Sequence, residues 1–180
     1  RLLFERGKCM QDAVPIGKGA MLAILGTEIQ EINNYLLEIK ARGVCEVAND
    51  NAQGQIIVSG NIEPVEELKN ILKKNKKKGI TLPVSAPFHC SLMNSAAEKM
   101  REKINTTNFR KPDLEIIGNV TASSVNSPDE IKKLLIQQIY SKVRWRESII
   151  FMEKNKINDF IEIGPGKVLT GLVKRILPNS

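Results

Sequence analysis

Residues 20–39, AMLAILGTEIQEINNYLLEI, decide how the first half of the chain folds. The short apolar run 20–25 lies between glycines, which is typical of a buried strand. Four apolar residues then recur at spacings of three and four, and these are Ile29, Ile32, Leu36 and Ile39. This spacing predicts an amphipathic helix, with Thr27 as its N-cap and Gly43 near its end.

The residues that follow continue this alternation of strands and helices. Strands are expected at 44–48, 56–58 and 80–84, and a second helix is expected at 64–74. The segment 49–54, NDNAQG, is dense in turn formers and indicates a hairpin between two of these strands. The order βαββαβ is the ferredoxin-like pattern, a four-stranded antiparallel sheet covered by helices.

The second half combines several helices with only two candidate strands. Helices are expected at 94–105, from Ser127 onward, at 146–155 and at 168–176, and strands at 114–117 and 160–163. Ser127 can cap its helix, Pro128 suits the first turn, and Glu130 can close a capping box. Two strands are too few for a sheet with its own core, so we expect this half to complete a larger sheet. The start at Arg1, inside a predicted helix, also indicates a segment of a longer protein.

The composition is that of an ordinary globular protein. The chain has 180 residues and a formal net charge of +7, with 42% hydrophobic and 26% charged residues. Aromatic residues make up only 4%, which argues against a protein that stacks many nucleobases. No run of about 18 uncharged apolar residues occurs, so a membrane-spanning helix is not expected.

The cysteines and the single histidine limit the possible chemistry. Cys9, Cys45 and Cys90 are widely spaced and form no CxxC pair, so neither a zinc knuckle nor a disulfide framework is indicated. Three unpaired thiols fit a reducing compartment, and we expect a cytoplasmic location. His89 is the only histidine, which excludes a multi-histidine metal site, and we predict no bound metal.

His89 is the strongest candidate for a catalytic group. It lies in PVSAPFHC, residues 83–90, directly after a predicted strand. Two prolines restrict the backbone of this stretch, and an imidazole held in one place suits a general base or acid. The alternative is a histidine that merely packs at a strand end. Cys90 is adjacent to His89, but neighbouring side chains generally point in different directions, so it is a poor candidate nucleophile.

An ordered series of motifs extends over almost the whole chain. The matching stretches are RGKCMQDAVP (6–15), GAM (19–21), ANDN (48–51), QIIVSG (55–60), LPVSAPFHC (82–90), NVTA (119–122), QIY (138–140), VRW (143–145) and EIGPGKVLTGL (162–172). In these stretches the sequence resembles the malonyl-CoA:acyl-carrier-protein transacylases, which load malonyl groups for fatty-acid synthesis. The resemblance implies an α/β fold of two lobes: an α/β-hydrolase-like acyltransferase lobe and an inserted ferredoxin-like lobe, which has the α+β class.

The resemblance also implies a division of the chain. Residues 1–13 form a helix of the large lobe, 14–86 form the ferredoxin-like small lobe, and 87–180 form the C-terminal part of the large lobe. The family's nucleophilic serine lies in a Gly-x-Ser-x-Gly elbow upstream of the segment that matches Arg6. No two glycines of this chain lie four residues apart, so the elbow is absent. We therefore expect this chain to be the C-terminal portion of such an enzyme and to be inactive by itself.

Five residues receive roles from the resemblance. Arg6 matches the arginine that holds the malonyl carboxylate, for which a guanidinium fork is well suited. His89 matches the catalytic histidine, and Gln138 matches the residue whose backbone carbonyl orients that imidazole. Asn49 and Asn51 match positions beside the active-site cleft, although plain turn chemistry explains them equally well.

The implied reaction uses malonyl-CoA as substrate and CoA as product, with no cofactor. The implied partners are acyl carrier protein and the missing N-terminal part of the same enzyme, with neither nucleic acid nor membrane. Two alternatives stay open. One is an RNA-binding module, although the predicted strands lack the aromatics such sheets use. The other is a polyketide synthase acyltransferase domain with another extender unit. The lysines between 73 and 78 form either a solvated helix end or a landing patch for an acidic partner.

Overall fold

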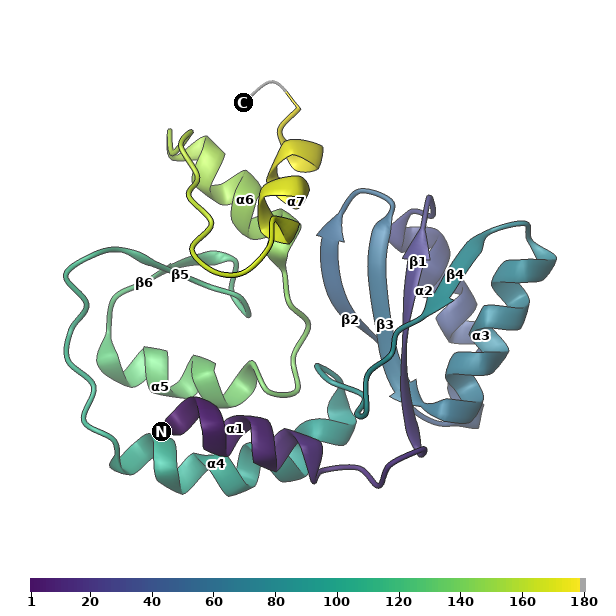
Figure 1. The fold of residues 1–180 in the computed structure, drawn as a ribbon, viewed down its shortest axis with the longest axis horizontal. Helices are drawn as coiled ribbons and strands as arrows, with labels where there is room; N and C mark the ends of the chain where they lie inside the picture. The colour runs from purple at the N-terminus through teal and green to yellow at the C-terminus, as the bar shows by residue number, and fades with distance from the viewer. Residues whose placement is uncertain (179–180) are drawn as a thin grey trace.

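The computed structural model describes residues 1–178, and its first half is built around one antiparallel sheet. The strands are β1 (Gly19–Leu25), β2 (Cys45–Ala52), β3 (Gln55–Asn61) and β4 (Lys78–Thr81), in the order β2-β3-β1-β4 (Figure 1). Two helices, α2 (Ile29–Ile39) and α3 (Ile62–Lys74), share one apolar core with these strands. A short 3₁₀ helix (Lys40–Arg42) ends α2 before Gly43. The predicted ferredoxin-like arrangement is therefore confirmed.

Two local predictions in this half are wrong. Thr27 does not cap α2, because the helix begins after Glu28 and the buried Thr27 hydroxyl has no hydrogen-bond partner among residues 1–178. The turn predicted at 49–54 is also too long, since β2 continues to Ala52 and only two residues form the turn. Pairing with β3 overrides the local turn propensity of these polar residues, at the cost of two register shifts in β2.

A layer of helices combines the first helix of the chain with two helices of the second half. The helices α1 (Leu2–Gln11), α4 (Asn94–Thr106) and α5 (Pro128–Gln137) share a second apolar core, and a 3₁₀ helix (Ser91–Met93) leads into α4 (Figure 1). Val14, the first residue of the predicted small lobe, packs with this helical core.

The remaining described elements do not belong to this helical core. They are a hairpin of β5 (Ile116–Gly118) and β6 (Ser123–Val125), and two helices, α6 (Trp145–Lys154) and α7 (Val168–Ile176). Ser127 precedes α5, but its side chain makes no capping hydrogen bond, so the predicted capping box does not form. None of the described helices is long and apolar enough to cross a membrane.

The strand predicted at 160–163 is wrong for this chain. The segment is extended coil, and no strand within residues 1–178 pairs with it. The side chains of Ile161 and Ile163 are 87% and 95% exposed. The alternating pattern is that of a strand, but a strand needs a neighbour to accept and donate its backbone hydrogen bonds. Residues 160–163 therefore have the sequence pattern of a strand, but no described strand pairs with them.

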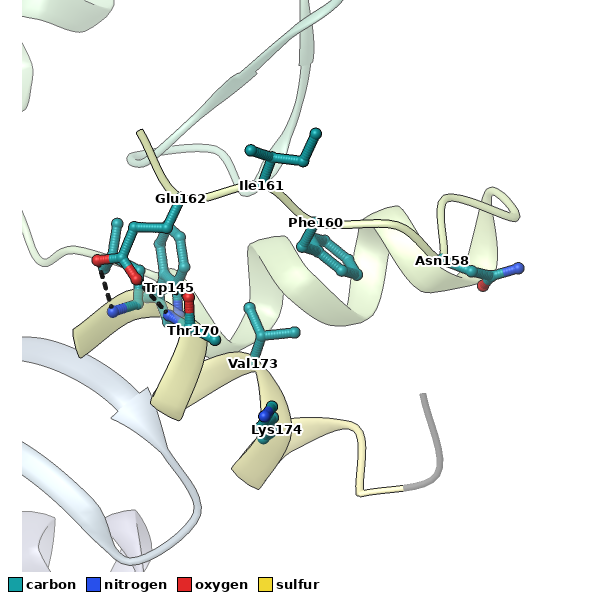
Figure 2. A pocket seen from close by; sticks show the side chains of 9 residues that line it. Trp145, Asn158, Phe160, Ile161, Glu162, Thr170, Val173 and Lys174 are labelled. Atoms are coloured by element: carbon teal, nitrogen blue, oxygen red, sulfur yellow. Dashed lines mark hydrogen bonds between the residues drawn. The ribbon is translucent and has the colours of Figure 1, made fainter. Parts of the chain in front are cut away.

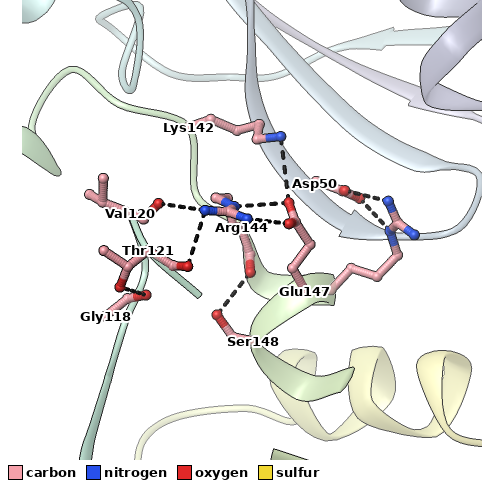
Figure 3. Close-up of polar contacts among 9 residues, drawn as sticks. Asp50, Gly118, Val120, Thr121, Lys142, Arg144, Glu147 and Ser148 are labelled. Carbon is pink, nitrogen blue, oxygen red and sulfur yellow. Dashed lines mark hydrogen bonds and ion pairs between the residues drawn. The ribbon is translucent and has the colours of Figure 1, made fainter. Parts of the chain in front are cut away.

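The two halves are joined along β2. The Asp50 amide donates to the Val143 carbonyl (2.9 Å), and the Val143 amide donates to the Ala48 carbonyl (2.8 Å). The Arg146 guanidinium donates two hydrogen bonds, of 2.9 and 2.7 Å, to the fully buried Asp50 carboxylate. Next to this pair, Arg144 binds Glu147 and two backbone carbonyls of the β5–β6 connection (Figure 3).

We expect Asp50→Asn to lower the free energy of unfolding by about 1–3 kcal/mol, because a buried charge-assisted pair loses one partner. Urea denaturation followed by circular dichroism measures this change. Glu67→Gln is the matched control, since Glu67 meets Arg42 at 3.6 Å on the exposed surface. The control should change stability by less than about 0.5 kcal/mol. Equal effects of the two variants would show that the Asp50 pair does not hold the halves together.

Candidate active site

His89 lies in the connection between β4 and the 3₁₀ helix that leads into α4. Its backbone has a φ of +59°, in the left-handed region that few residues other than glycine adopt. The ring Nδ1 is 3.0 Å from the carbonyl oxygen of Gln138. Because a carbonyl can only accept, Nδ1 carries the hydrogen of the neutral ring. The Nε2 lone pair is then available to take a proton.

The surroundings of His89 favour its neutral form. Burial lowers the pKa of the imidazole, and the Gln138 carbonyl opposes that effect. The positive charge of Arg6 lowers the pKa further, and the Ser141 backbone raises it. Burial comes first among these causes, so the ring is a neutral base at pH 7. The structure thus brings together three predicted site residues, namely His89, Gln138 and Arg6.

Arg6 lies on α1, and its guanidinium is partly buried. Burial lowers the pKa of Arg6, although the group stays protonated at every physiological pH. No carboxylate among residues 1–178 forms an ion pair with it, whereas eight other ion pairs occur in that range. A partly desolvated cation without an ion-pair partner among residues 1–178 can chemically accept an anionic ligand group.

Asn49 and Asn51 lie on β2 rather than in a turn, and both are partly exposed. Asn49 forms a parallel bridge with Val143, which follows Gln138 by five residues. Neither asparagine side chain makes a hydrogen bond to His89, Arg6 or any other of the described residues. The strand therefore places Asn49 beside the segment that carries Gln138, and no direct contact links Asn51 to the histidine.

One contact near His89 was not predicted from the sequence. The Glu46 carboxylate accepts hydrogen bonds from the amide (2.8 Å) and the hydroxyl (2.6 Å) of Ser91, two residues after the histidine. Glu46 and Ser91 are 45 residues apart, and neither lies in a recognisable motif. Only the three-dimensional packing of β2 against the 3₁₀ helix could reveal this pair.

Cys90 is a fully buried thiol next to His89. Burial raises its pKa, and its Sγ lies 3.1 Å from the Pro87 carbonyl, to which the thiol donates. It is therefore a neutral thiol at pH 7 and a poor nucleophile. Burial likewise raises the pKa of Cys45 to about 12.

The single histidine allows a direct test of this electrostatic environment. We expect the His89 imidazole to titrate below the ordinary histidine value of about 6.5. Protonation then favours the unfolded chain, so the free energy of unfolding falls as the pH drops below about 6.5, and this fall levels off below the folded pKa, where both states carry the proton. Nuclear magnetic resonance titration of the one imidazole measures the value. A value at or above that of a histidine in the urea-unfolded chain would show that burial does not dominate.

A separate hollow of about 230 Å³ lies between α6, α7 and the segment 158–162 (Figure 2). There the Glu162 carboxylate accepts hydrogen bonds from the amides of Leu169 (3.1 Å) and Thr170 (2.8 Å) at the start of α7. Its lining includes none of the predicted site residues. No group of three or more histidine, cysteine, aspartate or glutamate side chains within residues 1–178 could hold a metal ion.

Comparisons by sequence and by structure both match this chain to malonyl CoA-acyl carrier protein transacylases. The malonyl CoA-acyl carrier protein transacylase of Bacillus subtilis is 42% identical over 174 residues, which cover 96% of this chain and 55% of the relative. That of Escherichia coli K12 is 38% identical over 178 residues, covering 98% of this chain and 58% of the relative. The chain is homologous to the malonyl CoA-acyl carrier protein transacylases. It spans a little over half the length of these curated relatives, and no protein-family model matches it.

Solved transacylase structures superpose on nearly all of the chain. The Coxiella burnetii transacylase matches with a TM-score of 0.96 at 37% identity, covering 99% of this chain and 57% of that one. A structure described as a type II PKS acyl-carrier protein in complex with its malonyl-transacylase matches with a TM-score of 0.95 at 37% identity. It covers 99% of this chain and 58% of the matched one. The predicted fold class, a ferredoxin-like unit with part of the larger acyltransferase unit, agrees with these matches.

Proposed function

We propose that this chain supplies the histidine and arginine side of an [acyl-carrier-protein] S-malonyltransferase. The observation that carries the proposal is the hydrogen bond of 3.0 Å between Nδ1 of His89 and the Gln138 carbonyl. The charge of Arg6, which has no ion-pair partner among residues 1–178, lowers the pKa of the same ring. A carbonyl that fixes the tautomer does for this histidine what aspartate does in a serine triad. The nucleophilic serine would come from sequence outside the chain, and the reaction would use no cofactor.

The proposed reaction transfers the malonyl group in two steps. As the serine oxygen attacks the thioester carbonyl, Nε2 of His89 takes the serine proton, the C–S bond breaks, and the imidazolium protonates the leaving CoA thiolate. The phosphopantetheine thiol of acyl carrier protein then gives its proton to Nε2 and attacks the seryl ester. The C–O bond breaks, and the imidazolium returns the proton to the serine oxygen.

The roles of the remaining site residues follow from charge and position. The Arg6 guanidinium would bind the malonyl carboxylate through parallel hydrogen bonds and discriminate against uncharged acyl groups. Asn49 and Asn51 would border the acyl-binding cleft, Asn49 from beside the Gln138 segment. We propose a division into 1–13, 14–86 and 87–180, which the two separate apolar cores support except at Val14, since this residue packs with the helical core. The cytoplasmic location remains a prediction from the cysteines.

We propose that a polypeptide equivalent to the missing N-terminal part covers the exposed apolar residues of the larger unit. Leu114, Ile161 and Ile163 are each more than 80% exposed, and the coil at 160–163 has the alternation of a strand. Exposed apolar side chains with free backbone groups are typical of an uncovered interface. On pairing, 160–163 would become the strand that the sequence predicts.

A malonyl-transfer assay tests the proposed function. The chain alone is expected to show no transfer from malonyl-CoA to holo acyl carrier protein. The same chain, refolded with the part of the Bacillus subtilis relative that it does not match, should restore transfer. The control mixture contains that partner without this chain. Transfer by the chain alone, or none in a mixture that forms a stable complex, contradicts the proposal.

A further inference from the structure

The backbone around His89 adopts a conformation that needs support. A non-glycine residue in the left-handed region costs on the order of 1 kcal/mol. The residues before it are held by short-range contacts, since the Phe88 amide donates to the Ala86 carbonyl (3.1 Å) and the Cys90 thiol donates to the Pro87 carbonyl (3.1 Å). Both hydrogen bonds stay within the loop, while the Pro87 ring packs against Gly19 at the start of β1.

The charged contact between this loop and the sheet comes from Glu46. One carboxylate oxygen accepts the Ser91 amide at 2.8 Å and the other accepts the Ser91 hydroxyl at 2.6 Å. Hydrogen bonds to an ionised carboxylate are roughly twice as strong as neutral ones. Ser91 is also the first residue of the 3₁₀ helix that leads into α4. The Glu46 carboxylate thus binds the chain at the point where the His89 loop enters the helical layer.

Glu46 is itself held by the sheet. Within β2 it pairs with Ser59 of β3, and β3 pairs in turn with β1 over seven residues. The imidazole itself is held from the other half of the chain, where the Gln138 carbonyl accepts a hydrogen bond from Nδ1. The ring is therefore held at its edge by one half of the chain, while the backbone that carries it is anchored to the sheet.

We propose that Glu46, acting through Ser91, is a positioning residue for His89. Its carboxylate holds the 89–91 backbone where Nδ1–H meets the Gln138 carbonyl and Nε2 stays free to take a proton. The proposal rests on the proposed role of His89 as the base. It assigns Glu46 no contact with substrate.

The test uses ¹⁵N resonance spectra of the imidazole, which are simple because the chain has one histidine. We expect the wild-type ring to be mainly the Nδ1–H tautomer. Glu46→Gln, which keeps the size but removes the charge, should shift the ring toward a mixture of tautomers. Its pKa should rise toward the ordinary value, because a loosened ring is better hydrated. Ser91→Ala should produce a smaller shift toward a mixture of tautomers. Ser91→Thr, which keeps the hydroxyl, should give the same tautomer and pKa as the wild type.

Glu98→Gln is the matched control, since Glu98 also forms a carboxylate pair, with Arg101 at 2.7 Å, but on the exposed surface of α4. Amide resonances of β1 and β3 report whether each variant keeps the sheet. Folded Glu46→Gln and Ser91→Ala variants with the wild-type tautomer and titration overturn the proposal. In the enzyme refolded from this chain and the complementary part of the Bacillus subtilis relative, Glu46→Gln should lower kcat by up to about 100-fold with little change in KM. If the spectra change but His89→Ala leaves transfer intact, the positioning stands and the proposed function fails.

Discussion

We expect His89→Ala to slow acylation by about 10²–10⁴-fold, the range that general acid–base catalysis contributes. The enzyme in this experiment is the chain refolded with the complementary part of the Bacillus subtilis relative. The reason is geometric. The imidazole is the only one in the chain, its Nδ1 is committed to the Gln138 carbonyl, and burial keeps Nε2 unprotonated at pH 7. No other described side chain near this position combines a neutral base with a fixed orientation.

The measurement is the pre-steady-state burst of CoA release from malonyl-CoA. Cys90→Ser is the matched control, because it changes the adjacent residue, keeps a donor for the Pro87 carbonyl, and removes the neighbouring thiol. The control should keep a burst close to that of the wild type. Wild-type burst kinetics in His89→Ala would exclude the histidine as the base, and loss of the burst in Cys90→Ser would implicate the thiol.

The second large effect concerns selectivity. Arg6→Ala should lower kcat/KM for malonyl-CoA by about 10–100-fold, because hydrogen bonds to charged groups contribute about 1.5–3 kcal/mol. The rate with acetyl-CoA should change little, since an acetyl group has no carboxylate for the guanidinium to bind. Arg6 is suited to this role because it is partly buried and unpaired among residues 1–178.

Competition between the two thioesters in one reaction measures the selectivity directly. Arg6→Lys should give an intermediate value, since it keeps the charge but loses the two-pronged geometry. Lys8→Ala, on the same helix, controls for loss of a positive charge from α1. An equal fall in both rates for Arg6→Ala would mean that the arginine supports the fold or the histidine, and not the carboxylate.

The elements with strong periodicity were predictable from the sequence. The spacing of Ile29, Ile32, Leu36 and Ile39 gave the helix α2, and the apolar run 20–25 gave β1. Both succeed because the hydrophobic period reports which side of an element is buried. The last helix, Val168–Ile176, was also predicted at its observed bounds.

The errors arise where distant contacts override local propensity. Asn49, Asp50 and Asn51 favour turns, yet they lie in β2 because this strand pairs with β3. Asp50 also binds Arg146, 96 residues away. The segment 160–163 shows the reverse case, with strand periodicity but no neighbouring strand within residues 1–178. A sequence pattern reports which faces an element can bury, and it does not report whether a partner is present.

The candidate site was predictable only in part. The prolines around His89 indicated a fixed imidazole, and the ordered motifs indicated which arginine and which carbonyl belong to it. The left-handed backbone at His89 and the Glu46–Ser91 contact carry no sequence signal of their own. They depend on how β2 packs against the connection that follows β4.

The central claim is that this chain supplies the base while another polypeptide supplies the nucleophile. Intact-protein mass spectrometry tests it most directly, on the mixture with the complementary polypeptide after brief exposure to malonyl-CoA without carrier protein. We predict a malonyl ester on the complementary polypeptide, none on this chain, and much slower labelling with His89→Ala. A stable malonyl adduct on this chain, or unchanged labelling of the partner when this chain is left out, would contradict the account.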